Sequence, residues 1–253
     1  MCETSQEEMM RYLSLPKDGP WVAVRETFAS SDEEARRLLR ERIQRAQVWF
    51  FDLDDNHAYS PAKTIAKNAT GTSYLSPTYL LWCMTTAWAL FREGKNAECR
   101  TWEKYITTFL QDTDVRRRVR EQWSPEVVQQ SLYPGVQDFC SEVSHAWRLY
   151  VTRNIEEVAE AFAEALDFEK YVAEAGAKER IVEHFVREHP GFDSYGVEGD
   201  SECDGMMAEV LRFYNKDVIA ICSMDKPREP VRMFDVSVSK NRQGLVDILQ
   251  SQI

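Results

Sequence analysis

The chain has 253 residues, of which 43% are hydrophobic and 29% charged, and this balance excludes an intrinsically disordered chain. Asp and Glu outnumber Lys and Arg by 42 to 31, so the formal charge is −11. Nucleic acid and an anionic membrane are therefore poor electrostatic partners for this surface. An anionic ligand would need local cations or a metal ion to bind.

The most apolar stretch, residues 79–91, is shorter than the roughly 20 residues that a bilayer-spanning helix needs. The first residues, MCETSQEEMM, are polar and acidic, unlike a signal or transit peptide. The 6 Cys residues include no C-x-x-C pair, which favours reduced thiols. We therefore expect a cytoplasmic protein with no membrane contact.

The N-terminal part, residues 1–45, is predicted to be an extension that carries one helix. Residues 1–29 contain no periodic pattern and are expected to be irregular. Ser31 and Glu34 form a capping box at the start of a helix predicted over 32–45. The run VWFF that follows is a block of β-forming residues, typical of a strand buried on both faces of a parallel sheet.

Residues 58–132 are predicted to form a helical insert. Ser76-Pro77 is a helix-start signal, and a second helix is predicted from an apolar stripe between 99 and 110. Asp114 is the predicted cap of a third helix, and Ser124 that of a fourth.

Beyond residue 132, predicted strands and helices alternate. The strands are expected at 147–151, 193–197, 217–222 and 231–236. The helices are expected from Asn154, as a cap with Glu157, to 166, from Lys178 onward, and over 206–214 and 243–249. This alternation predicts an α/β fold, a doubly wound, Rossmann-like parallel sheet with helices on both faces.

Polar side chains gather where the predicted strands end. In doubly wound sheets, ligands bind at the carboxyl ends of the strands, so these side chains are the candidate site. Carboxylate oxygens suit Mg²⁺, whereas a lysine and a helix N-terminus suit phosphate. These side chains are Asp52 and Asp54, Lys178, the segment Thr152-Arg153-Asn154, and the segment 199–204, which includes Asp200 and Asp204.

The order of these segments resembles the four motifs of the haloacid dehalogenase (HAD) superfamily of phosphohydrolases. The segments are FFDLDDN at 50–56, LYVTRN at 149–154, Lys178 and GVEGDSECD at 196–204. The segment LYPGV also looks like the point where the chain re-enters the core in members with a helical cap. The resemblance implies a HAD-like α/β core formed by 46–57 and 133–253, with 58–132 as an inserted all-helical cap of the C1 type.

The resemblance also implies roles for the reacting groups. Asp52 would be the nucleophile that becomes an aspartyl-phosphate. Asp54 would protonate the leaving oxygen and then deprotonate the attacking water. Thr152 and Lys178 would bind the phosphoryl group.

The implied cofactor is Mg²⁺, held by the Asp52 carboxylate, the Asp54 carbonyl and Asp200. Asp204 would be a supporting carboxylate. The expected activity is therefore Mg²⁺-dependent hydrolysis of a small phosphorylated metabolite.

Two alternatives stay open from the sequence: a phosphotransferase or phosphomutase of the same superfamily, and a non-catalytic binding or regulatory protein on this scaffold. The second alternative draws on Asn56, which stands where the family pattern usually has Thr or Val. His57 could face the substrate or could be a hinge or surface residue. Neither the substrate nor the oligomeric state follows from the sequence.

Overall fold

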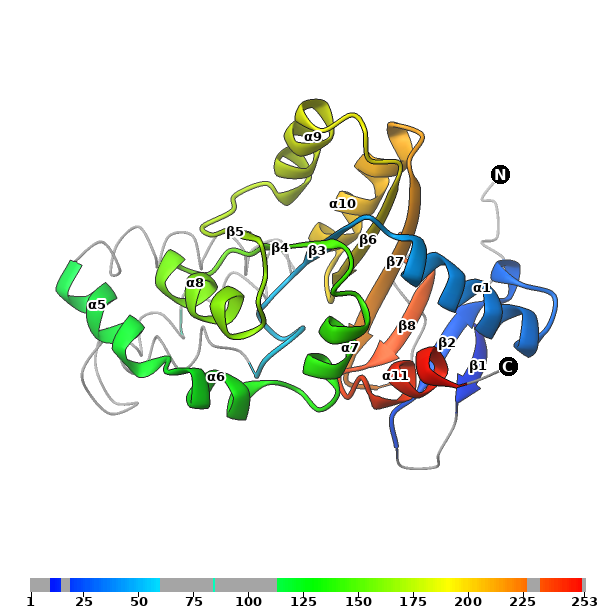
Figure 1. The fold of residues 1–253 in the computed structure, drawn as a ribbon, viewed down its shortest axis with the longest axis horizontal. Coiled ribbons are helices and arrows are strands. Elements are labelled where there is room, and N and C mark those ends of the chain that lie inside the picture. Colours follow the sequence, from blue (N-terminus) through cyan, green and yellow to red (C-terminus); the bar gives the residue numbers. More distant parts are fainter. Residues whose placement is uncertain (1–9, 15–18, 60–83, 85–112, 227–232, 252–253) are drawn as a thin grey trace. The chain divides into compact units, whose positions relative to one another are not determined.

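The computed structural model describes residues 10–14, 19–59, 84, 113–226 and 233–251 (Figure 1). Their packing forms two units. The first contains the described residues of Met1–Asp52, Tyr133–Arg148 and Ala177–Ile253, and the second those of Leu53–Leu132 and Leu149–Gly176. The helices predicted near residue 76 and over 99–110 lie outside the described residues, so they and the cap boundaries stay predictions.

The first unit is built on a sheet whose strands follow the order β1-β2-β8-β7-β6-β3. These strands are β1 (Met10–Ser14), β2 (Val22–Arg25), β3 (Val48–Phe51), β6 (Ser194–Gly199), β7 (Asp217–Met224) and β8 (Val236–Ser239). The helices are η1 (Glu26–Phe28), α1 (Asp32–Arg45), α7 (Val136–Glu142), α9 (Lys178–Glu188), α10 (Glu202–Phe213) and α11 (Gln243–Gln250).

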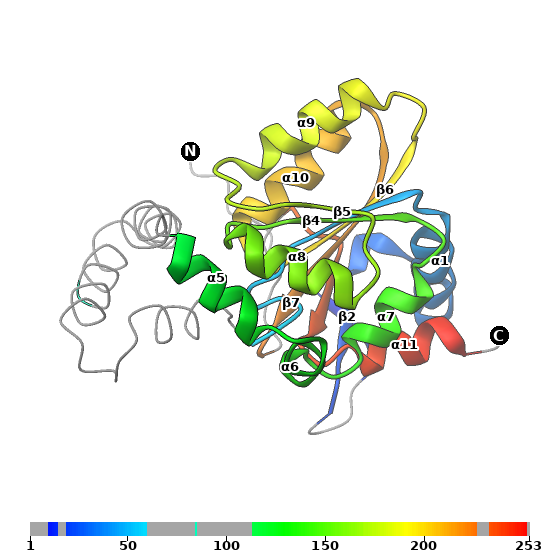
Figure 2. The same cartoon turned by 60° about the vertical axis from the view of Figure 1, so that its left-hand side comes forward.

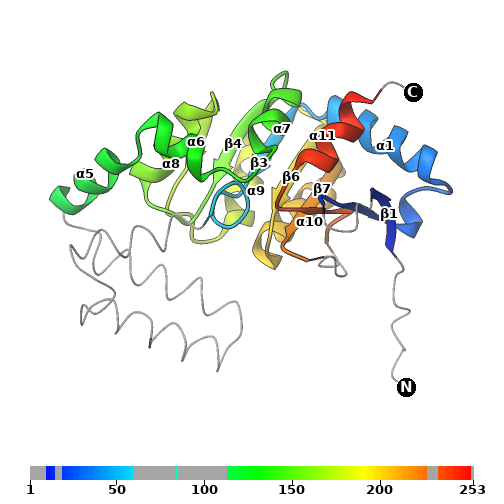
Figure 3. The ribbon, with the colours of Figure 1, turned by 90° about the horizontal axis from the view of Figure 1, so that it is seen from below.

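Helices cover both faces of this sheet, as predicted for a doubly wound fold. Helices α9 and α10 pack together on one face, while α1, α7 and α11 lie on the other (Figures 2 and 3). Strands β3, β6, β7 and β8 run parallel to their neighbours in this series. The predicted α/β fold class is therefore confirmed.

The prediction of an irregular N-terminal segment is wrong for two stretches. Strands β1 and β2 pair antiparallel with each other, and β2 pairs antiparallel with β8. The partner of Val22 is Val238, far away in the sequence, and both side chains are fully buried. Such a strand forms because of a distant partner, and a four-residue segment shows too little local pattern to reveal it. The helix α1 has the predicted bounds, and the Ser31 hydroxyl accepts from the Glu34 amide at 3.2 Å.

Strand β3 is held in the centre of the core by aromatic packing. Trp49 stacks on Phe51 with ring centroids 5.4 Å apart, and its ring lies edge-on to Phe139 of α7 at 5.5 Å. A side chain at Gly196, the residue paired with Trp49, would place its Cβ 2.2 Å from the indole ring. Only glycine leaves room for that ring, so the position of β3 and of the residues that follow it is tightly defined.

The second unit contains β4 (Trp147–Val151, which begins in the first unit), β5 (Lys170–Val172), α5 (Thr113–Gln122), α6 (Pro125–Ser131) and α8 (Glu156–Ala165). Strands β4 and β5 are parallel, and α5 and α6 pack on α8. Ion pairs join α5 to α8, with Arg116 2.7 Å from Glu157 and Arg120 2.7 Å from Glu164.

Several element bounds differ from those predicted. Helix α10 begins four residues earlier than residue 206 because Ser201 and Asp204 form a capping box. The last strand is β8 at Val236–Ser239 rather than 231–236, and α5 already includes Thr113, so Asp114 lies within its first turn. Helix α7 and strand β5 were not predicted, whereas Ser124 caps α6 as expected.

Within the described part of the chain, none of the helices combines the length and the apolar character that crossing a membrane requires.

Candidate active site

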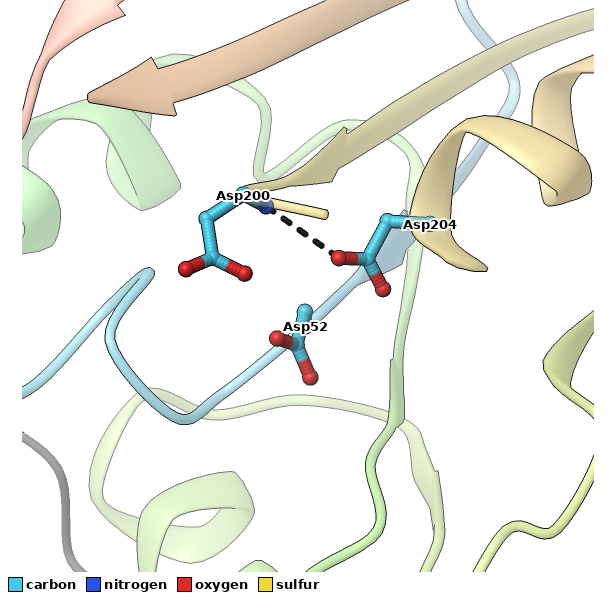
Figure 4. Close-up of side chains that lie close together, drawn as sticks. All are labelled: Asp52, Asp200 and Asp204. Atoms are coloured by element: carbon cyan, nitrogen blue, oxygen red, sulfur yellow. Dashed lines mark hydrogen bonds between the residues drawn. The ribbon is translucent and has the colours of Figure 1, made fainter. Parts of the chain in front are cut away.

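The site is organised by two neighbouring strands of the first unit. Asp52 directly follows β3, and Asp200 directly follows β6. The two strands are parallel, and the Asp52 amide donates to the Glu198 carbonyl at 2.9 Å, which continues their ladder by one residue. The two carboxylates therefore leave the same edge of the sheet side by side (Figure 4).

Asp204 lies in the first turn of α10 and ties the loop after β6 to that helix. Its Oδ2 accepts from the Asp200 amide at 3.1 Å, from the Ser201 amide at 3.1 Å and from the Ser201 hydroxyl at 2.6 Å. A Cβ at Gly199 would lie 2.2 Å from the Asp204 Cβ, so a glycine is needed for the carboxylate to fit beneath the strand end. Asp204 thereby fixes the backbone that carries Asp200.

Lys178, at the first position of α9, joins two of these carboxylates. Its Nζ lies 2.5 Å from Asp52 Oδ1 and 2.7 Å from Asp204 Oδ1, and the residue is only 2% exposed. Burial alone would lower the pKa of Lys178, but the charges of Asp204 and Asp52 outweigh burial and hold the pKa above its usual value. Burial would raise the pKa of Asp204, but the charge of Lys178 and the hydrogen bonds from Lys178 and Ser201 together outweigh burial and lower it. The ammonium of Lys178 and the carboxylate of Asp204 are therefore ionised together at neutral pH.

Three carboxylates meet at this point, and their chemistry fits a divalent cation. Asp52, Asp200 and Asp204 each offer an oxygen, and these oxygens lie within 4.8 Å of one another. Lys178 contacts two of the three carboxylates, Asp52 and Asp204. An all-oxygen donor set of this kind suits Mg²⁺ rather than a softer metal. Both oxygens of Asp204 accept hydrogen bonds, from Lys178 and from Ser201, which suits a supporting role.

The two other predicted residues, Asp54 and Thr152, belong to the second unit, where Asn154 links them. The Asn154 side-chain amide donates to both carboxylate oxygens of Asp54, at 3.1 and 3.0 Å. The Asn154 backbone amide donates to the Thr152 hydroxyl at 3.1 Å. The prediction that Asn154 caps the next helix is wrong, since the cap position of α8 is Ile155. The sequence did contain a signal for a role of Asn154 in the site, because the segment TRN follows directly after a strand.

The loop after Asp54 is compact. Asp55 has a positive φ of 55°, and the amides of Asn56 and His57 both donate to the Leu53 carbonyl. His57 is fully buried, and its Nδ1 lies 2.7 Å from the Tyr150 hydroxyl. His57 is thus an interior residue of the second unit and not a surface histidine. Asn56 is also fully buried, as a turn residue.

One buried ion pair near the site was missed by sequence reasoning. Glu198 lies on β6, two residues before Asp200, and its Oε1 is 2.5 Å from Nε of Arg242. Both side chains are 0% exposed. No sequence motif predicts this pair, because Glu198 and Arg242 are distant in sequence and meet only in the folded chain.

No protein-family model matches this sequence, and no curated protein matches it. Among solved structures, a cytosolic 5′-nucleotidase IIIB bound to cytidine is similar, with a TM-score of 0.58, 11% identity and coverage of 90% of this chain and 93% of that one. A substrate-bound phosphoserine phosphatase has a TM-score of 0.55, 11% identity and coverage of 81% and 99%. A haloacid dehalogenase-like hydrolase from Burkholderia xenovorans has a TM-score of 0.50, 10% identity and coverage of 82% and 100%.

At such low identity these similarities show the fold alone. The chain has the fold of HAD-superfamily phosphatases, as the sequence motifs predicted. The C1 type of cap stays a prediction.

Proposed function

We propose that the chain is a Mg²⁺-dependent phosphatase that hydrolyses a small phosphorylated metabolite through an aspartyl-phosphate at Asp52. The observation that carries this proposal is the buried cluster in which Lys178 bridges Asp52 and Asp204 beside Asp200. The described fold supports it, because two proteins of similar structure are a phosphatase and a nucleotidase.

Asp52 is suited to act as the nucleophile because it is held and partly neutralised. Lys178 contacts its Oδ1, which orients the carboxylate and lowers its repulsion of an anionic phosphate. A carboxylate oxygen of Asp52 attacks phosphorus, and the bond from phosphorus to the ester oxygen breaks. Asp54 gives its proton to that leaving oxygen, so the products of the first step are the free alcohol and an acyl phosphate on Asp52.

Water completes the reaction. A water oxygen attacks phosphorus, its proton passes to Asp54, and the bond between phosphorus and the Asp52 oxygen breaks. Inorganic phosphate leaves, and Asp52 is again a carboxylate while Asp54 is again protonated. Thr152, whose hydroxyl follows the end of β4, is assigned to bind a phosphoryl oxygen, and Lys178 is assigned to neutralise its charge.

The residues that would hold Mg²⁺ are Asp52, Asp200 and the Asp54 carbonyl, with Asp204 supporting Asp200 through its hydrogen bond to the Asp200 amide. When bound, the ion would supply positive charge to the phosphoryl oxygens and reduce their repulsion by the carboxylates.

The test is a screen of phosphorylated metabolites with Mg²⁺, in which both released phosphate and the remaining substrate are measured. Asp52→Asn serves as the matched control, because the amide keeps the size of the side chain but cannot attack phosphorus. We expect phosphate release by the wild type and none above background by the variant. Loss of substrate without phosphate release would indicate transfer to another acceptor, and no turnover of any phosphomonoester would overturn the proposal.

A further inference from the structure

We infer that Asn154 is a positioning residue for the acid–base step, and that its side-chain amide holds the carboxyl group of Asp54 in the orientation needed for proton transfer. The inference rests on the proposed function and adds a residue to it. Both residues belong to the second unit, so their contact is described within one packed body.

The contact is specific in both of its partners. The Asn154 Nδ2 lies 3.1 Å from Asp54 Oδ1 and 3.0 Å from Oδ2, so one amide group spans the whole carboxylate. The amide oxygen of Asn154 accepts from the Ile155 backbone amide at 2.8 Å. An amide oxygen cannot donate, so this second contact fixes which end of the side chain faces Asp54.

The backbone beneath Asn154 is held equally firmly. Its amide donates to the Thr152 hydroxyl at 3.1 Å, and its carbonyl accepts from the Glu174 amide at 2.8 Å. The Thr152 carbonyl accepts from the Ala175 amide at 2.9 Å. Asn154 is 0% exposed, so these hydrogen bonds are shielded from water. A rigid, buried donor of this kind is what an orienting residue requires.

The orientation of Asp54 needs such support. Asp54 is only partly buried and begins a turn, and the following residue has a positive φ. A proton-transferring group must lie within hydrogen-bond distance of the atom it serves, and small misplacement costs large factors in rate. A neutral amide can hold the carboxyl group before and after proton transfer, because at least one carboxyl oxygen remains a good acceptor in both states.

The experiment compares Asn154→Ala and Asn154→Asp with the wild type and with Asp54→Asn. Asn154→Asp keeps the size of the side chain and the acceptor for Ile155, but it replaces the donating amide by a repelling carboxylate. Glu156→Gln is the control for a change at the start of α8, because Glu156 is exposed and lies two residues away. Folding of each variant is checked by thermal melting. If Asn154→Ala does not fold, the test is made with Asn154→Asp.

The readout is rapid mixing with 4-nitrophenyl phosphate and Mg²⁺, in which nitrophenolate and inorganic phosphate are followed separately. The good leaving group needs little help from an acid. Both Asn154 variants should therefore release a first burst of nitrophenolate equal in amount to the enzyme, and the rate of this burst should lie within about threefold of the wild-type rate. Steady-state phosphate release should fall about 10- to 100-fold in kcat, with a much smaller change in KM. Glu156→Gln should match the wild type.

A double-mutant cycle decides between positioning and general damage. If Asn154 acts through Asp54, then Asp54→Asn with Asn154→Ala should turn over within about twofold of Asp54→Asn alone. The inference is overturned if Asn154→Ala leaves kcat unchanged, or if it slows the Asp54→Asn enzyme by the same factor as it slows the wild type. A wild type that hydrolyses no phosphomonoester would instead overturn the proposed function, and this inference with it.

Discussion

Two groups of buried charges lie in the first unit, and they differ in the number of carboxylates that they bring together. In the first group, Lys178 is 2% exposed and is shared by Asp52 and Asp204. In the second, Arg242 pairs with Glu198, and both side chains are 0% exposed. Glu198 and Asp200 lie two residues apart at the end of the same strand, yet the groups around them are built differently.

The pair of Arg242 and Glu198 is supported by backbone carbonyls. Nη1 of Arg242 donates to the carbonyls of Ser239 and Lys240 at 2.8 and 2.9 Å, and its Nε donates to Glu198 Oε1 at 2.5 Å. In the Lys178 group, three carboxylates have oxygens within 4.8 Å of one another, and Asp200 is only partly buried. Carboxylates gathered at an accessible edge suit a cation site, whereas we assign the buried pair of Arg242 and Glu198 to the stability of the fold.

The largest expected effect is that of Asp52→Asn. The amide cannot form an acyl phosphate, so we expect turnover to fall by on the order of 10⁴-fold or more. The fold should persist, because the amide oxygen still accepts from Lys178, which also keeps Asp204. Phosphate release and a thermal melt measure the two properties, and near wild-type turnover would show that the nucleophile is another residue.

Arg242→Met should sharpen the contrast by changing stability and not chemistry. It leaves Glu198 buried without its cation, so the free energy of unfolding should fall by about 3–5 kcal/mol. The double variant with Glu198→Leu should recover most of that loss, since it removes both charges. Urea unfolding measures the change. If Arg242→Met had the wild-type free energy of unfolding but no longer responded to Mg²⁺, the assignment of Arg242 to stability rather than to metal binding would be wrong.

Removal of metal should affect the Lys178 group alone. Excess chelator should reduce turnover by at least about 100-fold, because a bound cation is worth several kcal/mol of charge stabilisation to a phosphoryl transition state. In thermal melts, Mg²⁺ should raise the wild-type Tm, and Asp200→Asn should abolish that rise. Full activity in chelator would contradict the metal assignment.

The smallest expected effect is on the pH dependence of stability. Because the pKa of Asp204 is lowered in the folded chain, its ionised form stabilises the fold above the ordinary value of about 3.9, and this contribution is lost as the pH falls below it. The pKa of Lys178 is raised, so its contribution persists up to about pH 10 and is lost at higher pH. Urea unfolding between about pH 6 and 3 should therefore show a steeper acid loss for wild type than for Asp204→Asn. Parallel slopes would contradict the pairing.

The sequence was informative wherever a signal was local. The N-cap of α1, in which the Ser31 hydroxyl accepts from the Glu34 amide, lies within four residues. The apolar block of β3 ends in its own acidic turn, so both features could be predicted. The pairing of β2 with β8 could not, because Val22 and Val238 meet only in the folded chain.

The candidate site shows the same limit. Asp52, Lys178, Asp200 and Asp204 were identified by motif order, and the fold brings these four together. Asn154 was assigned to the wrong partner, since its residue type suits both a helix cap and a carboxylate. The pairing of Arg242 with Glu198 depends entirely on the tertiary fold.

The central claim, that Asp52 carries the phosphoryl group, is tested most directly by chemical trapping. Enzyme that is turning over a phosphomonoester with Mg²⁺ is quenched and reduced with borohydride, which converts an aspartyl-phosphate to homoserine, and the peptide containing residues 48–55 is analysed by mass spectrometry. Asp54→Asn, in which the intermediate should accumulate, provides the enriched sample. The account predicts homoserine at position 52 and nowhere else. Steady phosphate release with no homoserine at that position, or with homoserine at another aspartate, would contradict it.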